Sequence, residues 1–268
     1  MKFTKAVATG NDFIIVDNRD GLIPEKEKHA LAKKVCDRKR AIGADGLLLV
    51  EPSKKCDFKM RIFNPNGSEA EMCGNGSRCV ALYAARNKIA KPEMTIETLA
   101  GRLDAVVRGN MVKVKLTEPK DIKWNFCLMI NKCPYKVSFV DTGVPHVIHF
   151  VDDIDGVDVK NLGSYMRNHG EFSPEGTNAD FVKILGKNTI KIRTYERGVE
   201  DETLACGTGA VASAIISAEV ERMTSPVTVQ TQGGEKIRVH FEMIDGSFKN
   251  VYLEGKAELV YEGVTNDI

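Results

Sequence analysis

The sequence lacks any long hydrophobic run. None of its 268 residues lies in an apolar stretch that approaches the roughly 20 residues a membrane-spanning helix needs, and Met1–Lys5 lacks the apolar segment of a signal peptide. A charge excess is also absent, because the formal net charge is +1, so no global field attracts nucleic acid or an anionic membrane. We expect a cytoplasmic protein with no nucleic-acid or membrane partner.

The cysteine and glycine spacings exclude further classes. Seven cysteines are an odd number in a chain without an export signal, so structural disulfides are not expected. No Cys-x-x-Cys or His-x-x-x-His pair occurs, and we expect no metal site. The glycine loops lack the Walker lysine and the Gly-x-Gly-x-x-Gly spacing, and no pyridoxal lysine signature is recognisable, so we expect no cofactor. Five cysteines are interpreted as buried or incidental thiols: Cys36, Cys56, Cys79, Cys127 and Cys133.

One short construction occurs twice, 133 residues apart: Cys73-Gly74-Asn75-Gly76 recurs as Cys206-Gly207-Thr208-Gly209. The same offset relates three further pairs of segments, which are Thr9-Gly10 with Thr142-Gly143, Thr95–Thr98 with Thr228–Thr231, and Gly101 with Gly234. Because the offset is almost half of the 268 residues, we expect two like halves. The two thiols, one from each half, would then lie on opposite sides of a shared cleft.

Strand patterns dominate the remainder of the chain. Short apolar or alternating segments predict strands at 12–16, 47–50, 58–63, 111–116 and 237–241. Surface helices are expected at 25–37 and 161–168, and buried apolar helices at 77–86 and 210–218. The sequence therefore predicts an α+β protein of two pseudo-symmetric domains, each a strand-rich barrel-like shell around a central apolar helix. The expected linker is 118–123.

The chemistry is expected where each cysteine loop meets its buried helix. The free N–H groups and positive dipole end of a helix N-terminus bind anions such as a carboxylate, and the same field lowers a cysteine pKa. A single Cys-Gly-x-Gly before a helix is most often a turn with a buried thiol. Two copies in matched positions favour a carboxylate cradle with an activated sulfur beside it.

Several polar residues accompany the two loops. Asn11, Asn64 and Asn178 stand in compact contexts where asparagine most often serves a turn. Glu196-Arg197 precedes Cys206 by about ten residues; alone it would be a surface ion pair, but beside a carboxylate cleft it is a candidate for holding the polar ends of an amino acid. His146 is a candidate for tuning a thiol, although a lone histidine is more often structural.

Taken together, the motifs resemble those of the diaminopimelate epimerase family. The segments that carry the resemblance are spread over nearly the whole chain: 10–13 (GNDF), 61–64 (RIFN), 71–79 (EMCGNGSRC), 196–198 (ERG) and 202–209 (ETLACGTG). The resemblance implies a cofactor-independent isomerase that interconverts LL- and meso-2,6-diaminopimelate on the route to lysine and peptidoglycan, with its active site in the cleft between two domains. It places an N-terminal domain at 1–118, joined by a C-terminal strand at 258–268, and a second domain at 119–257.

The resemblance also implies a role for each matching residue. Cys73 and Cys206 match the acid/base cysteines. The family's loop residues that hold the reacting carboxylate correspond to Gly74, Asn75, Gly76, Gly207 and Thr208. The family's residues that bind the distal end of the substrate correspond to Asn11, Asn64, Asn178 and Arg197. Glu196 matches a residue that contacts the reacting ammonium, and His146 a supporting histidine. Two positions depart from the family pattern: Val144, often Asn, and Gly46, often Gln.

Other functions stay open at this point. A second two-cysteine racemase, acting on proline or hydroxyproline, is the nearest; Glu196, Arg197 and the asparagines favour a substrate with a second polar end. A thiol redox protein and a non-catalytic amino-acid-binding module are the alternatives outside this class. The sequence leaves open whether the chain forms a homodimer.

Overall fold

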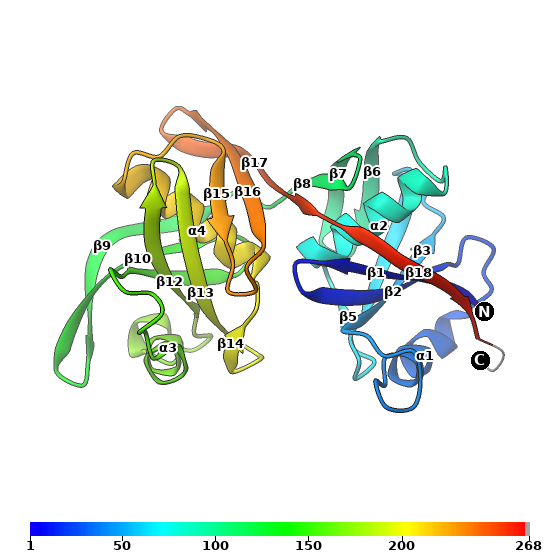
Figure 1. Ribbon diagram of the computed structural model, residues 1–268, viewed down its shortest axis with the longest axis horizontal. Coiled ribbons are helices and arrows are strands. Elements are labelled where there is room, and N and C mark those ends of the chain that lie inside the picture. The colour runs from blue at the N-terminus through cyan, green and yellow to red at the C-terminus, as the bar shows by residue number, and fades with distance from the viewer. Residues whose placement is uncertain (266–268) are drawn as a thin grey trace. The chain divides into compact units, whose positions relative to one another are not determined.

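The computed structural model describes residues 1–265, which divide into two compact units (Figure 1). Unit 1 comprises Met1–Lys115 and the chain from Gly255 onward, and unit 2 comprises Leu116–Glu254. Each boundary lies three residues before the one expected from the sequence. The expected linker at 118–123 is wrong in most of its length, because strand β9 begins at Lys120. The last three residues of the expected C-terminal strand at 258–268 lie outside the described residues.

Unit 1 is a mixed sheet with two α-helices. Its strands are β1 (Lys2–Ala8), β2 (Asn11–Asp17), β3 (Gly46–Glu51), β4 (Phe58–Phe63), β5 (Glu69–Ala70), β6 (Glu93–Thr98), β7 (Gly101–Arg108), β8 (Met111–Lys115) and β18 (Glu258–Val264). Its helices are the 3-10 turn η1 (Glu25–Glu27), α1 (Lys28–Val35) and α2 (Gly74–Arg86). The surface helix expected at 25–37 is therefore a 3-10 turn followed by a shorter α-helix.

Unit 2 has the same composition of elements. Its strands are β9 (Lys120–Ile130), β10 (Cys133–Asp141), β11 (Pro145–Phe150), β12 (Asn178–Gly186), β13 (Thr189–Glu196), β14 (Asp201–Thr203), β15 (Val227–Gln230), β16 (Lys236–Ile244) and β17 (Ser247–Lys256), the last of which runs past the unit boundary. Its helices are α3 (Val159–Arg167), the 3-10 turn η2 (Gly170–Phe172) and α4 (Gly207–Val220).

The strand connections of the two units repeat one another. In unit 1, β1–β2 is antiparallel, β2–β3 parallel, β3–β4 antiparallel and β4–β6 parallel. In unit 2, β10–β11, β11–β12, β12–β13 and β13–β15 follow the same alternation. The outer strand beside β1 is β18, and the one beside β10 is β9. The repeated topology confirms the pseudo-symmetric α+β fold expected from the 133-residue offset.

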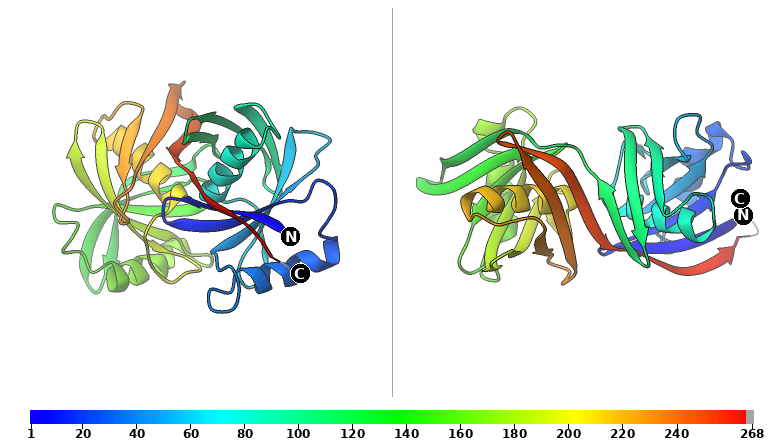
Figure 2. Two further views of the ribbon diagram at one scale, coloured as in Figure 1. Left: turned by 45° about the vertical axis from the view of Figure 1, so that its right-hand side comes forward. Right: turned by 90° about the horizontal axis from the view of Figure 1, so that it is seen from above.

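Each sheet curves around one central helix (Figures 1 and 2). Helix α2 contacts β1, β2, β3, β4, β7, β8 and β18, and helix α4 contacts β10, β11, β12, β13, β15 and β16. The residues from Ala210 to Ile216 are all fully buried, as expected of a helix that is apolar on every side. Both helices start three residues earlier than expected, immediately after Cys73 and Cys206.

Strands near the centre of each sheet are covered on both faces. In unit 1, helix α1 packs through Leu31, Ala32 and Val35 on the outer side of β2 and β3. Burial on both faces explains why Leu47–Val50 is a continuous apolar run rather than an alternating one. Helix α3 covers β12 and β13 in the same way in unit 2, where Val159 and Met166 join a cluster with Phe181. The resulting layers hold the first turns of α2 and α4 on rigid supports.

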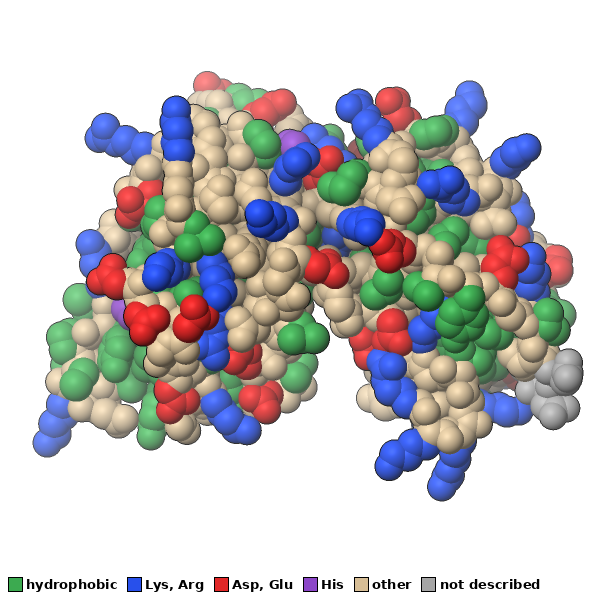
Figure 3. All heavy atoms as spheres, viewed as in Figure 1, with side chains coloured by type: hydrophobic (Ala, Val, Ile, Leu, Met, Phe, Trp, Pro, Cys, Tyr) green, Lys and Arg blue, Asp and Glu red, His purple; other side chains and the backbone are tan. Residues whose placement is uncertain are grey.

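The surface is polar and of mixed charge. On the face shown in Figure 3, basic and acidic side chains are interspersed, in keeping with the net charge of +1. No helix among residues 1–265 is both long enough and apolar enough to cross a membrane.

Candidate active site

Each repeated cysteine is the N-cap of a buried helix. Cys73 caps α2 in an extended conformation, and its sulfur accepts the backbone N–H of Gly76 (3.5 Å). Cys206 caps α4 in the same conformation, and its sulfur accepts the backbone N–H of Gly209 (3.4 Å). A cap residue usually supplies oxygen for this bond, so a sulfur in both caps is unusual. Two thiols thus lie directly at the positive ends of two helices.

Two of the expected asparagines lie beside Cys73. Asn75, in the first turn of α2, donates from Nδ2 to Oδ1 of Asn11 (2.5 Å). Asn11 begins β2 after a tight turn, in which Thr9 and Gly10 have positive φ, and its Nδ2 donates to Oδ2 of Asp45 (3.2 Å). The structure therefore brings Cys73, Asn75 and Asn11 together in unit 1, with Gly74 and Gly76 in the intervening loop.

Asn64 occupies a turn between β4 and β5. Its backbone N–H donates to the carbonyl of Ser68 (2.8 Å), and its Nδ2 donates to the hydroxyl of Ser68 (2.9 Å). These bonds are the turn-forming role that asparagine commonly has. Within the described residues, no hydrogen bond joins Asn64 to the Cys73 loop, so its placement in the site rests on the resemblance alone.

In unit 2, a chain of buried polar groups leads to Cys206. Its sulfur lies 3.4 Å from Oγ1 of Thr208, and that hydroxyl lies 3.0 Å from Nε2 of His146. On the other side of the imidazole, Nδ1 lies 2.7 Å from Oδ2 of Asp180. The hydroxyl of Thr194 donates to the second oxygen of Asp180 (2.6 Å). His146 and Asp180 are both fully buried.

The contacts of Asn178 fix the tautomer of His146. The backbone N–H of Arg197 donates to Oδ1 of Asn178 (2.7 Å), so the other end of that amide is Nδ2. Nδ2 lies 3.3 Å from Nε2 of His146 and donates to it. Nε2 therefore carries a lone pair, and Nδ1 carries the proton that is donated to Asp180. The hydroxyl of Thr208 lies within hydrogen-bond distance of both Nε2 and the Cys206 sulfur.

The neighbouring strand end holds the remaining candidates. Glu196 ends β13, and its Oε2 accepts from the hydroxyl of Thr203 (3.1 Å). Burial raises the pKa of the Glu196 carboxyl, which the Thr203 bond only partly opposes. Arg197 follows at once, and its Nη1 donates to the carbonyls of Glu175 (3.1 Å) and Gly176 (3.4 Å). Unit 2 thus gathers Cys206, Gly207, Thr208, His146, Asn178, Glu196 and Arg197 around one helix end.

The expectation that the helix field lowers the cysteine pKa is wrong for Cys206. Burial raises the pKa of this thiol well above its ordinary value, and the nearby carboxylates of Glu196 and Asp180 raise it further. The hydrogen bonds from Thr208 and Gly209 act in the opposite direction but are outweighed. Desolvation penalises a thiolate more strongly here than one helix end stabilises it.

Three residues that the sequence analysis did not propose for the site hydrogen-bond directly to candidate residues: Arg78 to Asn75, Asp45 to Asn11, and Asp180 to His146. A charged side chain within an apolar segment is the only sequence signal for Arg78 in α2 and for Asp180 in β12. Asp45 lies in the loop before β3 and is brought to Asn11 only by the parallel pairing of β2 and β3.

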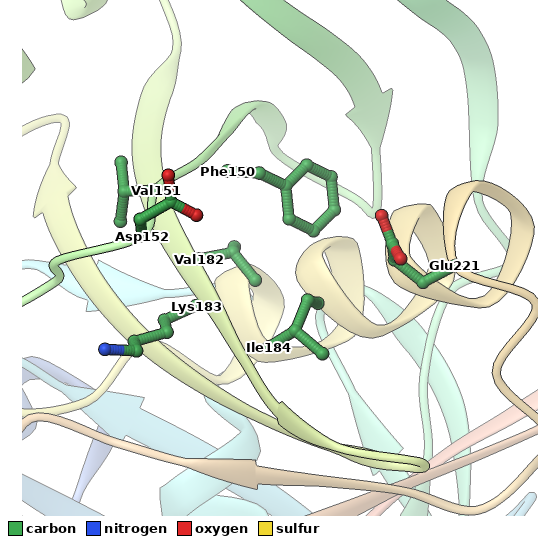
Figure 4. Close-up of a pocket in the computed structure, with 7 residues that line it drawn as sticks. All are labelled: Phe150, Val151, Asp152, Val182, Lys183, Ile184 and Glu221. Carbon is green, nitrogen blue, oxygen red and sulfur yellow. The ribbon is translucent and has the colours of Figure 1, made fainter.

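Two other features of the described residues lie outside this chemistry. No group of three or more His, Cys, Asp or Glu side chains in residues 1–265 is placed to hold a metal ion. A cavity of about 220 Å³ in unit 2 contains none of the candidates (Figure 4). It is lined by Phe150, Val151, Asp152, Val182, Lys183, Ile184 and Glu221.

Two solved structures have a similar fold. A phenazine biosynthesis protein of the PhzF family from Bacillus anthracis matches with a TM-score of 0.75 and 20% identity, covering 98% of both chains. A probable proline racemase from Agrobacterium radiobacter matches with a TM-score of 0.70 and 14% identity, over 99% of this chain and 93% of the other. At these identities the likeness establishes the fold alone.

The sequence comparisons are more specific. The model of the diaminopimelate epimerase family matches residues 3–122 and 138–260. The diaminopimelate epimerase of Methanocella arvoryzae is 44% identical over 98% of this chain and 96% of its own length. That of Aquifex aeolicus is 42% identical over 98% of this chain and 97% of its own. With the repeated fold and full-length matches in agreement, the chain belongs to the diaminopimelate epimerase family and is an isomerase.

Proposed function

We propose that this protein interconverts LL-2,6-diaminopimelate and meso-2,6-diaminopimelate, in the biosynthesis of lysine and peptidoglycan precursors, with Cys73 and Cys206 as its acid/base pair. The observation that carries the proposal is the matched cap geometry. Each sulfur is the N-cap of a buried helix and accepts a backbone N–H three residues on. Inverting an α-carbon requires one group to remove a proton from one face and another to deliver a proton to the opposite face.

The helix ends supply what the carbanion needs. Removal of an α-proton from an amino acid leaves negative charge that spreads onto the adjoining carboxylate. N–H groups in the first turns of α2 and α4, within the loops 74–76 and 207–209, are fixed donors for that carboxylate. Because the donors are already oriented, no reorganisation is needed when the charge develops.

The surroundings of Cys206 support a protonated resting state. Burial and the nearby carboxylates raise the pKa of Cys206, which favours the S–H form. Cys206 is then the acid for the first proton delivery, and Cys73 is the base. Once the proton has been transferred, the roles are reversed for the opposite stereoisomer, so the two thiols titrate as a coupled pair.

The polar residues of unit 2 account for an amino-acid substrate. Glu196 is a carboxylate of raised pKa beside Cys206, and a bound ammonium would offset the burial that raises that pKa. Arg197 and the asparagines suit a second charged end. A proline-sized ligand has no second charged end to meet those groups, which disfavours a proline-type racemase.

Isotope incorporation tests the mechanism. The protein is incubated with LL-diaminopimelate in D₂O, and the isomers are separated by chiral chromatography at less than about a tenth conversion. New meso product is expected to carry deuterium at the inverted centre, while the remaining LL substrate stays largely unlabelled. Mostly unlabelled meso product would contradict the two-thiol mechanism. L-Proline and trans-4-hydroxy-L-proline are assayed in parallel, and faster turnover of either would overturn the substrate assignment.

A further inference from the structure

Four side chains in unit 1 form a hydrogen-bonded line: Arg78, Asn75, Asn11 and Asp45. Both ends of the line are charged and both middle members are amides. We propose that Arg78 and Asp45 are positioning residues that fix which end of the Asn75 and Asn11 amides is presented to the substrate. The proposal rests on the proposed function, because it assigns a binding polarity to two residues of that site.

The inner end of the line is a guanidinium. Arg78 is fully buried in α2, and its Nη2 donates to Oδ1 of Asn75 and to the hydroxyl of Thr9 (2.6 Å). Its Nη1 donates to the backbone carbonyl of Lys256 (3.5 Å). A guanidinium has donors only. Asn75 must therefore turn its oxygen toward Arg78 and its nitrogen away.

The outer end of the line is a carboxylate. Asp45 accepts Nδ2 of Asn11 on Oδ2 (3.2 Å), and the backbone N–H of Asp12 donates to the same oxygen (3.3 Å). Nη2 of Arg38 donates a hydrogen bond to the other oxygen of Asp45, Oδ1 (2.7 Å). An ionised carboxylate only accepts hydrogen bonds. Asn11 must therefore turn its nitrogen toward Asp45 and its oxygen toward Asn75.

The middle link agrees with both ends. Nδ2 of Asn75 donates to Oδ1 of Asn11 (2.5 Å). Flipping either amide would place two donors together at Arg78 or two acceptors together at Asp45. The two charges therefore hold one direction along the whole line.

The fixed direction determines what the two asparagines can bind. Each oxygen already accepts a hydrogen bond within the line, whereas each Nδ2 donates one of its two N–H groups there and keeps a second. In residues 1–265 that second N–H has no acceptor. Asn75 and Asn11 therefore act as donors, and the group they select is an acceptor such as a carboxylate oxygen, rather than an ammonium.

The test compares variants of the full chain. Arg78→Met removes the donor fork, Arg78→Lys keeps the charge without the fork, and Asp45→Asn loosens the outer end at a half-buried position. The matched control is Arg86→Met, which removes an exposed arginine of the same helix that donates to Asn110 (2.9 Å). KM and kcat for LL-diaminopimelate are measured with the melting temperature. The side-chain ¹H–¹⁵N resonances of Asn75 and Asn11 are followed by NMR, assigned through Asn75→Asp and Asn11→Asp.

We expect Arg78→Met to lose about 10- to 100-fold in kcat/KM, the range for a hydrogen bond to a charged group. The loss falls mainly on KM, since substrate binding is weakened before chemistry, and both amide resonances shift. Arg78→Lys lies between Arg78→Met and the wild type, Asp45→Asn loses about 3- to 10-fold, and Arg86→Met stays within twofold. A merely structural role would instead reduce the melting temperature and the active fraction while KM stays constant.

The proposal is overturned if folded Arg78→Met keeps both amide resonances, or if its KM stays within twofold of the wild type. Should Arg78→Met fail to fold, Arg78→Lys and Asp45→Asn decide by the same two readouts. If the wild-type protein does not epimerise diaminopimelate, the proposed function fails. The amide resonances still test the positioning role in that case, because they require no substrate.

Discussion

Nδ1 of His146 lies 2.7 Å from Oδ2 of Asp180, and neither side chain is exposed to solvent. The donor from Asn178 on the other ring nitrogen leaves Nδ1 as the protonated position. Asp180 therefore holds the imidazole in one orientation. The other ring nitrogen then contacts the hydroxyl of Thr208, which in turn contacts the sulfur of Cys206. We propose that this buried carboxylate affects the reaction through His146 and Thr208, without contacting the substrate itself.

Asp180→Asn tests that relationship. The new amide competes as a donor to Nδ1, which shifts the imidazole proton to Nε2, where it opposes the N–H of Asn178. We expect kcat to fall by about 10²-fold, at the lower end of what loss of an acid/base group costs, while the circular dichroism spectrum is retained. Asp155→Asn, which removes an exposed partner of Lys191, serves as the control. Unchanged kcat in a folded Asp180→Asn variant would show that the tautomer is immaterial.

The two cysteines should be equally indispensable. Cys73→Ala and Cys206→Ala each remove a group that acts as base in one direction and acid in the other. We expect each variant to lose at least about 10²-fold in kcat for both LL and meso substrates, with secondary structure intact. Chiral chromatography of each product measures this. Retention of more than a tenth of wild-type turnover by either variant would contradict the acid/base pair.

Alanine at the two matched glycines should have unequal effects. A Cβ at Gly209 would lie 2.6 Å from Oδ1 of Asp180, a distance that forces the carboxylate to move. A Cβ at Gly76 would meet the flexible end of Leu48 at 3.2 Å. We expect Gly209→Ala to reduce kcat by about tenfold or more by displacing the His146 partner, and Gly76→Ala to reduce it less. Steady-state kinetics decides, and a larger loss for Gly76→Ala would argue against the role of Asp180.

The raised pKa of Glu196 predicts how substrate affinity depends on pH. Burial shifts the carboxyl above its ordinary value of 4.5, so a bound ammonium finds the ionised form only above that raised pKa. We expect kcat/KM to fall on the acid side with an apparent pKa above 4.5. Glu196→Gln should have a lower kcat/KM that no longer shows this limb. A pH profile unaltered by Glu196→Gln would assign the acid limb to another group.

Acid stability should depend on Asp12. Burial opposes ionisation of this carboxyl, but hydrogen bonds from Arg38 and Lys5 outweigh it and lower its pKa from 3.8 to about 2. The stabilisation is fully present above the unfolded value of 3.8 and is lost as the pH falls toward 2. Its size is at most about 2 kcal/mol. Urea unfolding followed by circular dichroism between pH 5 and 2 should show a flatter pH dependence for Asp12→Asn, and parallel curves would exclude this residue as a source.

Local sequence determined a large part of this protein. The alternation of Phe58–Phe63 and the apolar composition of 77–86 and 210–218 predicted a strand and two buried helices, because burial periodicity follows directly from residue order. The 133-residue offset predicted a repeated topology, which the matching parallel pairs β2–β3 and β11–β12 confirm. The Cys-Gly-x-Gly loops likewise predicted two helix N-termini, although the cysteines proved to be the caps themselves.

The electrostatic environment of the Cys206 thiol was decided by the tertiary structure alone. The helix end at Cys206 predicts a lowered pKa from sequence, yet burial and the carboxylates of Glu196 and Asp180 reverse it. Those carboxylates come from two different strands, and no local pattern reports their distance from a sulfur. Desolvation and charge–charge interactions depend on separations in space. The same holds for the hydrogen-bonded line from Arg78 to Asp45, in which two of the three bonds join residues more than 30 positions apart along the chain. Residue order determined which groups this protein has, and only the folded chain decided which of them are buried together and hydrogen-bonded to one another.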